Sequence, residues 1–396
     1  MDERTGIGAA VRSARLRRGL SLDVVAGLAG HTKSWLSKVE RGVLPLERWA
    51  DLAALADALE VSPVDLTGLP HVPGRQGGPL DAAVVRVREA LQDFPDPARA
   101  DEPAKLVAET EALTPLRSSL DLAGLGEVLP GLLIRLRATV AATPGAEDRT
   151  RLLRAYFWAG HAAMGMTKNL GYLDLAWVAA LHVRQAAEGL DDPAWLAAAE
   201  FARAHALVAA GLTRAALGYS SAGADLASTA AGPDAAAAHG ALQLVAAYAA
   251  ALAGQTEEAS ARLDTAERVA AGENGPAFTR GFSFSPPNVG LHRMQVAVES
   301  GEPAQVAAAA AVLSAEALPT PERQATYWVD LGRAHAMMHG DEEAVRMLRR
   351  AERLAPLRVR LHPLVREAVA DMLCRPQRAP VSRELRGLAY RMGLPH

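Results

Sequence analysis

The chain has 396 residues, of which half are hydrophobic and only 5% are aromatic, and its formal net charge is −3. This length is too great for one small core and predicts two or three structural units. An interior built mainly from Ala, Leu and Val favours closely packed helices. The one cysteine, Cys374, excludes an internal disulfide framework and favours a reducing compartment.

No basic region followed by an apolar run opens the sequence, so we expect no secretory signal and a cytoplasmic protein. Alanine-rich runs such as residues 242–253 are shorter than a membrane span requires. We therefore expect no association with a membrane.

Residues 20–42 predict two short helices joined by a tight corner. Ser21 is suited to cap the first helix, which should end near Ala29, before Gly30. Its apolar residues recur at helical spacing: Val24, Val25 and Leu28.

Thr32 is suited to cap the second helix, whose apolar face is formed by Leu36 and Val39. Short polar and basic side chains occupy its opposite face: Lys33, Ser34, Ser37 and Lys38. A helix enters the major groove of B-DNA, where lysine donates to guanine and serine pairs with several base edges. This face is therefore suited to reading bases.

Residues 6–69 resemble the Xre family, the phage-repressor and Cro type of helix-turn-helix. The matching pieces, in order, are Arg12, Arg15, Gly19-Leu20-Ser21, Val25-Ala26 and Leu36-Ser37-Lys38-Val39-Glu40-Arg41-Gly42, followed by the core residues Leu52, Leu55, Ala56, Leu59, Val61 and Leu66. The resemblance implies an all-α, five-helix DNA-binding domain over residues 1–69.

By the family's pattern, Lys33, Ser34 and Lys38 occupy base-reading positions, and Arg15 pairs with Glu40. The full set of DNA-contacting residues that this implies is Arg17, Arg18, Ser21, Thr32, Lys33, Ser34, Trp35, Ser37, Lys38 and Arg41. Leu22 stands where the family usually has a phosphate-binding Gln, so either that contact is lost or Arg17, Arg18 or Lys33 supplies it.

Two readings of this segment stay open. Trp35 would either touch the sugar-phosphate backbone or pack against Leu16 or the loop after Gly42. The whole segment would alternatively be a plain helical bundle whose lysines form an ordinary solvated face.

Charge is distributed unevenly over the first 70 residues. Residues 1–41 carry eight basic and four acidic side chains, whereas residues 42–70 carry Arg48 against five acidic ones. A domain polarised in this way presents one positive face to phosphates. Because the excess is modest, we expect weak, salt-dependent binding by a monomer and a need for dimerisation.

Residues 70–80 are dense in Pro and Gly and predict a linker. Residues 81–396 predict helices broken at Pro and Gly, with a last helix over 380–396 whose apolar stripe is Leu385, Leu388 and Met392. That stripe would either cap the fold or form a dimer contact.

An internal repeat supports a tetratricopeptide-like solenoid in this second part. The pattern, about 34 residues long, is matched by Trp328, Leu331, Gly332, His335, Ala344, Leu348, Ala351 and Pro356. Residues 246–266 repeat the scheme loosely, with a turn near Gly254, and residues 151–190 and 193–231 predict further helical pairs. The concave face of such a solenoid commonly binds a peptide, a protein or a small molecule, although an alanine-rich bundle would resemble the weaker copies.

Residues 272–288 interrupt the helical pattern and hold three of the six phenylalanines. A loop of this kind would line a ligand pocket formed by Phe278, Phe282, Phe284, Asn288, His292 and Arg293. In the alternative, the phenylalanines fill a gap between repeats, and Asn288 caps a helix starting at Val289.

We predict no enzyme, cofactor or metal site. His335 and His339 are four apart, but Ala336 stands where a zinc protease needs Glu. Two histidines are only half a ligand set. No Gly-rich turn suited to a serine nucleophile or a phosphate follows a strand pattern.

The two-part layout is similar to bacterial peptide-sensing regulators of the Rgg and PlcR kind, and to actinobacterial regulators, which the Ala- and Arg-rich composition favours. This resemblance implies a homodimer on a double-stranded DNA operator, regulated by a ligand. Those sensors often clamp a peptide with several Asn side chains, whereas this chain has Asn169, Asn274 and Asn288, so a small molecule or a protein partner stays open. The alternative function is a scaffold whose repeats dock a protein partner.

Overall fold

The computed structural model describes residues 6–68, 79–272, 284–376 and 379–394, and every regular element within these ranges is a helix. The predicted all-α class is therefore confirmed. The N-terminal unit, residues 6–68, contains the five predicted helices: α1 (Ile7–Arg17), α2 (Leu22–Leu28), α3 (Lys33–Glu40), α4 (Trp49–Ala58) and α5 (Pro63–Thr67).

The face that α2 buries differs from the predicted one. Val25 lies in the core of the N-terminal unit together with Ala26 and Ala29, whereas Val24 and Leu28 are 47% and 67% exposed. A helix of two turns buries one narrow stripe, and here the stripe follows the spacing i, i+1, i+4. The prediction for Val24 and Leu28 was wrong by about a quarter-turn of helix rotation, roughly 100°.

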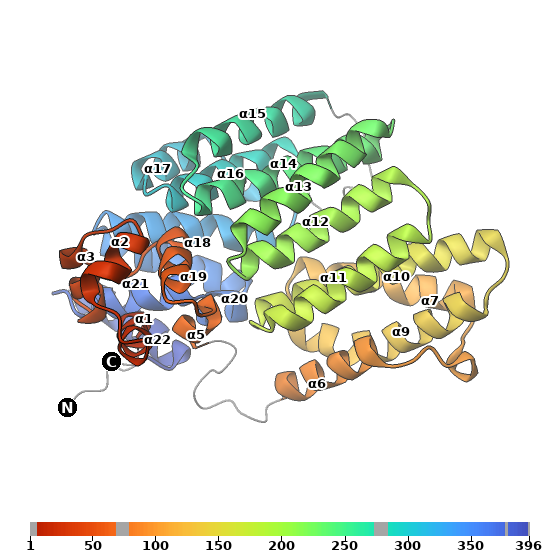
Figure 1. Cartoon of the computed structure of the whole chain (residues 1–396), viewed down its shortest axis with the longest axis horizontal. Coiled ribbons are helices and arrows are strands. Elements are labelled where there is room, and N and C mark those ends of the chain that lie inside the picture. The colour runs from red at the N-terminus through yellow and green to blue at the C-terminus, as the bar shows by residue number, and fades with distance from the viewer. Residues whose placement is uncertain (1–5, 69–78, 273–283, 377–378, 395–396) are drawn as a thin grey trace.

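In the helical body, residues 79–394, the described α-helices begin with a group of four and continue as five antiparallel hairpins and three closing helices (Figure 1). The first four are α6 (Pro79–Gln92), α7 (Pro103–Glu111), α8 (Leu113–Ser118) and α9 (Leu122–Ala142). The hairpins are α10 (Ala146–Asn169) with α11 (Leu173–Glu188), α12 (Pro193–Ala209) with α13 (Thr213–Thr229), α14 (Pro233–Leu252) with α15 (Thr256–Gly272), α16 (Pro286–Glu299) with α17 (Pro303–Val312), and α18 (Pro321–Met337) with α19 (Asp341–Leu354). The closing helices are α20 (Pro356–Leu361), α21 (Pro363–Leu373) and α22 (Ala379–Met392).

The hairpins follow the predicted pattern of small residues at helix crossings. A Cβ added at Gly332 on α18 would lie only 2.9 Å from Cγ of Leu348 on α19, so the two helices approach closely there. Gly254 has a φ of 72° and makes the predicted turn between α14 and α15. These features confirm the predicted helical pairs and build the solenoid.

The linker prediction needs a different boundary. Residues 69–78 lie outside the described residues, and α6 already begins at Pro79. Proline is well tolerated at the first position of a helix, where no intrahelical N–H bond is needed. The predicted linker is therefore shorter at its C-terminal end.

One described helix, α14, is long and apolar enough by composition to cross a membrane. This helix is longer than the alanine-rich run of residues 242–253 suggested, but 83% of its most apolar 18-residue stretch is buried inside the molecule. Burial on all sides by neighbouring helices accounts for its composition, because a core helix needs no polar face.

The last helices return to the start of the hairpin stack. Leu357 and Leu361 of α20 pack against the core that α10 to α15 share, and Nη1 of Arg358 donates to Oδ1 of Asn169 on α10 at 3.3 Å. Figure 1 shows the chain returning through α18 to α22, with the N-terminal unit beside these helices. The solenoid therefore closes on itself instead of remaining an open arc.

The predicted C-terminal helix is confirmed as α22. Its apolar stripe, Leu385, Leu388 and Met392, is buried in the core formed with α18, α19 and α21. The stripe caps the fold, so it is not available for the dimer contact considered as the alternative.

Specific contacts hold the N-terminal unit against the helical body. The backbone N–H of Ile7 donates to Oε1 of Glu367 at 2.7 Å, and that of Trp49 donates to Oε2 of Glu299 at 2.7 Å. Leu364 of α21 lies within the core of the N-terminal unit. The orientation of this unit is therefore set by the helical body and not only by the linker.

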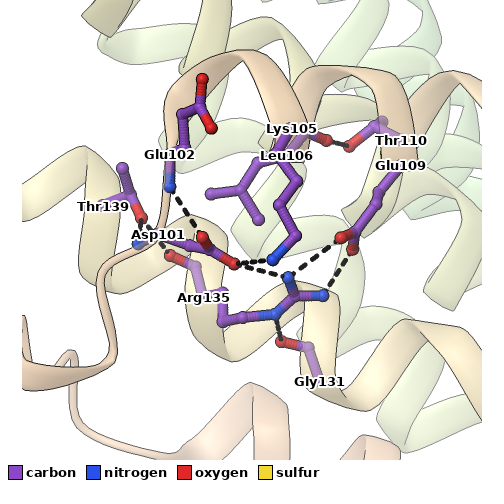
Figure 2. A network of polar contacts seen from close by, with 9 residues as sticks. All are labelled: Asp101, Glu102, Lys105, Leu106, Glu109, Thr110, Gly131, Arg135 and Thr139. Carbon is purple, nitrogen blue, oxygen red and sulfur yellow. Dashed lines mark hydrogen bonds and ion pairs between the residues drawn. The ribbon is translucent and has the colours of Figure 1, made fainter.

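At the other end of the molecule, Arg135 of α9 holds the segment that leads into α7 (Figure 2). Its Nη1 donates to Asp101 at 2.9 Å and to Glu109 at 3.1 Å, and its Nε donates to the carbonyl of Gly131. Hydrogen bonds lower the pKa of Asp101: the one from Lys105 has the largest effect, followed by those from the backbone of Glu102 and from Arg135. This network is a structural clamp at the surface of α7 and α9.

Candidate functional site

The caps of α2 and α3 fix where these two helices begin. The N–H of Val24 donates to Oγ of Ser21, and the N–H of Trp35 donates to Oγ1 of Thr32, both at 3.2 Å. Each side chain thereby satisfies one of the N–H groups that a helix leaves unpaired at its start. Both predicted caps are confirmed.

A buried ion pair locks α1 to α3. Nε and Nη2 of Arg15 contact the two carboxylate oxygens of Glu40 at 2.6 and 2.7 Å, and Nη1 donates to the carbonyl of Leu20. The hydrogen bonds that Arg15 donates to Glu40 raise the pKa of Arg15. This predicted pair is confirmed, and its two-pronged geometry holds α3 in one orientation.

The outer face of α3 presents the residues predicted to read bases. Lys33, Ser34 and Lys38 are exposed, and Ser37 is half-buried. Nζ of Lys33 forms an ion pair with Asp23 of α2 at 2.8 Å, whereas Lys38 has no ion pair with any residue that the structure describes. Nε of Arg41 donates to the carbonyl of Ser37.

Trp35 packs in a way that neither predicted alternative included. Its ring stacks on the imidazole of His31, with centroids 3.6 Å apart and an angle of 8° between the planes. Nε2 of His31 lies 3.0 Å from Oδ1 of Asp51 on α4, and Asp51 also accepts from Arg48. Leu16 stays exposed. A continuous chain of contacts therefore joins α3 to the start of α4.

The two arginines at the end of α1 differ in what they contact. Arg18 donates to the carbonyl of Leu59 at 2.5 Å and pairs with Glu60, which ties α1 to the end of α4. Arg17 donates to Ser13 on its own helix and stays at the surface. The contact with a phosphate remains a prediction for both.

Residues 7–68 match the family model described as a helix-turn-helix domain. This range runs from the first residue of α1 to the residue after α5. The N-terminal unit is therefore a helix-turn-helix domain, a type of domain that binds DNA. A comparison with curated proteins finds none that matches the chain.

The residues predicted around the aromatic loop do not form one site. Phe278 and Phe282 lie outside the described residues. Phe284 packs into the main core, where a Cβ added at Gly240 would lie 2.0 Å from its Cζ. This phenylalanine fills the space above a glycine on α14, as the alternative for this loop proposed.

The start of α16 also differs from the prediction. The helix begins at Pro286, and Oγ of Ser285, not Asn288, caps it by accepting the N–H of Asn288. Arg293 pairs with Asp264 and Glu267 on α15 at 2.9 and 2.6 Å, away from any pocket. Of the four described residues in this prediction, His292 lines a cavity.

That cavity lies between the helix-turn-helix domain and the helical body, has a volume of about 230 Å³, and is called the interdomain cavity below. The helix-turn-helix domain contributes Trp49, Pro63, Val64 and Thr67 to its wall. The helical body contributes a polar set, chiefly Lys168, His205, Tyr248, His292, Arg323 and Arg358. A smaller cavity of about 100 Å³, reaching toward α8, shares Lys168, Asn169, His205, Glu322 and Arg323 with it.

The polar residues of the interdomain cavity titrate abnormally because they are withdrawn from water. Burial lowers the pKa of Lys168 to about 8 and that of His292 to about 3, and it holds the pKa of His205 well below its usual range. Burial also raises the pKa of Asp330 to about 7. Burial alone would raise the pKa of Glu322, but the surrounding cations outweigh it and lower that pKa.

Sequence reasoning missed this polar set, apart from His292. Its members lie on separate helices, from α10 to α20, and meet only because the solenoid closes. One signal was present: Lys168 is one of only four lysines in an arginine-rich chain, and it follows a mostly apolar stretch of α10, residues 155–166.

Proposed function

We propose that the chain is a sequence-specific, DNA-binding transcription regulator in which α3 is the recognition helix. The observation that carries the proposal is a helix-turn-helix domain whose capped third helix bears exposed Lys33, Ser34 and Lys38. Figure 1 shows α3 at the left edge of the molecule. A DNA duplex has access to such an edge.

In this proposal α3 enters the major groove, where lysine ammonium groups donate to guanine O6 and N7. Exposed arginines of the helix-turn-helix domain, among them Arg12, Arg17 and Arg41, supply charge toward the phosphates. The chain binds and does not catalyse. Its affinity falls steeply with salt, because phosphate contacts release counterions from DNA.

We further propose that the protein acts as a homodimer with tetratricopeptide-like repeats, which hold two recognition helices about 34 Å apart on a near-palindromic operator. The contacts of Glu299 and Glu367 with the backbone of the helix-turn-helix domain support this, because they fix that domain to the body. A ligand bound by the repeats would then change operator binding.

The test begins with selection of bound sequences from a random duplex library, followed by affinity measurements on the selected duplex and on a scrambled one. Lys38→Ala should weaken binding to the selected duplex by about 1–3 kcal/mol, and binding to the scrambled duplex by less. Lys105→Ala is the matched control, because Lys105 is an exposed lysine that lies on α7, outside the helix-turn-helix domain.

An equal loss on both duplexes would contradict base reading by α3. If no sequence is enriched, the alternative function is favoured, namely a scaffold whose repeats dock a protein partner.

A further inference from the structure

We propose that the interdomain cavity binds a small organic carboxylate with an apolar body, and that this anion is the signal of the regulator. The carboxylate site follows from the chemistry of the cavity alone. Its role as a signal rests on the proposed DNA-binding function.

Positive charge is in excess around the carboxylate of Glu322. Four cations act on Glu322, which is the only acidic residue that the two adjoining cavities share: Arg117, Lys168, Arg323 and Arg358. Nη1 of Arg358 lies 3.8 Å from Oε1 of Glu322. Cations partly withdrawn from water need a partner of opposite charge, and Glu322 together with Asp330, the other acidic residue that lines the interdomain cavity, does not balance four of them.

The guanidinium of Arg323 has unsatisfied hydrogen-bond donors. Its Nε is buried without a hydrogen-bond partner, and its guanidinium forms no hydrogen bond or close ion pair with any residue described. Nε of Arg358 is buried and unpartnered as well. Buried donors are nearly always satisfied in native proteins, so these two groups indicate a ligand that accepts hydrogen bonds.

Lys168 stands beside them with donors to spare. Its Nζ donates one hydrogen bond to Nδ1 of His205 at 2.8 Å, and an ammonium group has three N–H donors. Lys168 and Arg323 line both cavities. Together with Arg358 they surround a space where a carboxylate would accept several charge-assisted hydrogen bonds.

One part of the wall of the interdomain cavity is apolar, which favours an organic carboxylate over an inorganic anion. It is formed by Trp49, Val64, Val208, Leu252 and Leu361. The residues from the helix-turn-helix domain line the larger cavity and are not among those of the smaller one. A ligand with its carboxylate near Lys168 would therefore direct its apolar body toward Trp49 and Val64.

This position couples the ligand to the DNA-binding domain. Trp49 is the first residue of α4, and its N–H donates to Glu299. The adjacent Arg48 donates to Asp51, and Asp51 contacts His31. The ring of His31 in turn stacks on Trp35 of α3. A ligand that contacts Trp49 and the helical body at once favours one arrangement of the two domains. A ligand with different contacts in two arrangements shifts their populations.

The experiment uses the full chain and two probe anions, octanoate and 4-phenylbutyrate, with octanol and inorganic phosphate as partial probes. Calorimetric titration without DNA should show binding of at least one probe anion, and at least tenfold weaker binding of octanol and of phosphate. Arg323→Gln should weaken binding of the anion at least tenfold. Arg293→Gln is the matched control, because Arg293 is paired on the outer face of α16 and α15 and should leave binding unchanged.

Arg358→Gln provides a second test if Arg323→Gln does not fold, and it should weaken binding to a similar extent. The proposal is overturned if neither anion binds, if octanol binds as tightly as octanoate, or if Arg293→Gln weakens binding as much as the cavity variants do.

The signal role is measured separately, as the affinity for the selected duplex with and without the bound anion. At least a fivefold change supports it, and an unchanged affinity overturns it. If no duplex is enriched while the anion still binds and depends on Arg323, the DNA-binding function has failed and the carboxylate site stands.

Discussion

The helix-turn-helix domain and the helical body use the same basic residues in opposite ways. On α3, Lys33 and Lys38 are exposed, and water solvates their ammonium groups. Around Glu322, Lys168 and Arg323 are half-buried in the walls of the two cavities, and burial lowers the pKa of both. An exposed cation is available to DNA at little cost to the fold, whereas a half-buried cation makes the fold depend on whatever balances its charge.

Four predictions test this contrast, from the largest expected effect to the smallest. The first concerns Arg333, whose Nη1 pairs with Glu299 at 3.0 Å and whose Nη2 donates to the carbonyl of Glu47. Arg333→Ala leaves Glu299, which is 1% exposed, without its cation, and should lower the free energy of unfolding by about 3–5 kcal/mol.

Urea unfolding measures this difference. Arg346→Ala is the control, since Arg346 pairs with Glu343 at the surface one turn away on α19, and its loss should cost less than about 1 kcal/mol. Similar losses in the two variants would remove the contrast between buried and exposed cations.

The second prediction concerns pH and His292. Burial lowers its folded-state pKa to about 3, while in the unfolded chain it titrates near 6.5. Between these values the unfolded state binds the extra proton, so stability falls as pH drops below about 6.5, by up to roughly 1.4 kcal/mol per pH unit for this residue.

Urea unfolding at several pH values between about 7.5 and about 5, which span the unfolded-state pKa, measures the slope. His292→Gln should show a smaller slope than the parent chain. Identical slopes would mean that His292 is protonated equally in both states.

The third prediction concerns the exposed pair between Asp23 and Lys33, which lie on α2 and α3. Asp23→Ala should change the free energy of unfolding by less than about 1 kcal/mol. It should also tighten DNA binding several-fold, because it releases Lys33 and removes a negative charge from the proposed interface. Affinity measured over a range of salt concentrations tests this, and unchanged affinity would place Lys33 outside the interface.

The smallest effect on stability is expected for Lys38→Ala. The side chain is exposed and has no ion pair with a described residue, so the free energy of unfolding should change by no more than about 0.5 kcal/mol. Thermal unfolding measures this change. A larger loss would show that Lys38 supports the fold, and it would weaken the interpretation of its DNA-binding variants.

Features determined by neighbouring residues were predictable from the sequence. Ser21 and Thr32 cap the helices they were expected to cap, and each cap involves an N–H only three residues ahead. The pairing of Arg15 with Glu40 is longer in range, and it followed from a family resemblance and not from local chemistry. The hairpin of α18 and α19 followed from its spacing of small and bulky residues.

Features that depend on the closed solenoid were not predictable in this way. Lys168, Arg323 and Trp49 meet in one cavity. Along the chain, each is separated from the next by roughly the length of a typical domain. Periodicity gives the buried face of each helix but not which helices later meet. Arg293 was expected in one site with His292, but consecutive residues on a helix do not share a face, and the two side chains meet different neighbours.

The closure of the molecule also sets an order of events during synthesis. The helix-turn-helix domain is complete in sequence at residue 68, but Leu364 and Glu367, which pack into it and bind its first helix, are made near the end of translation. Arg358, which joins α20 to α10, is equally late. The sequence of the helix-turn-helix domain is therefore synthesised before the cavity exists, and a chain truncated before α20 would contain this domain without the complete cavity.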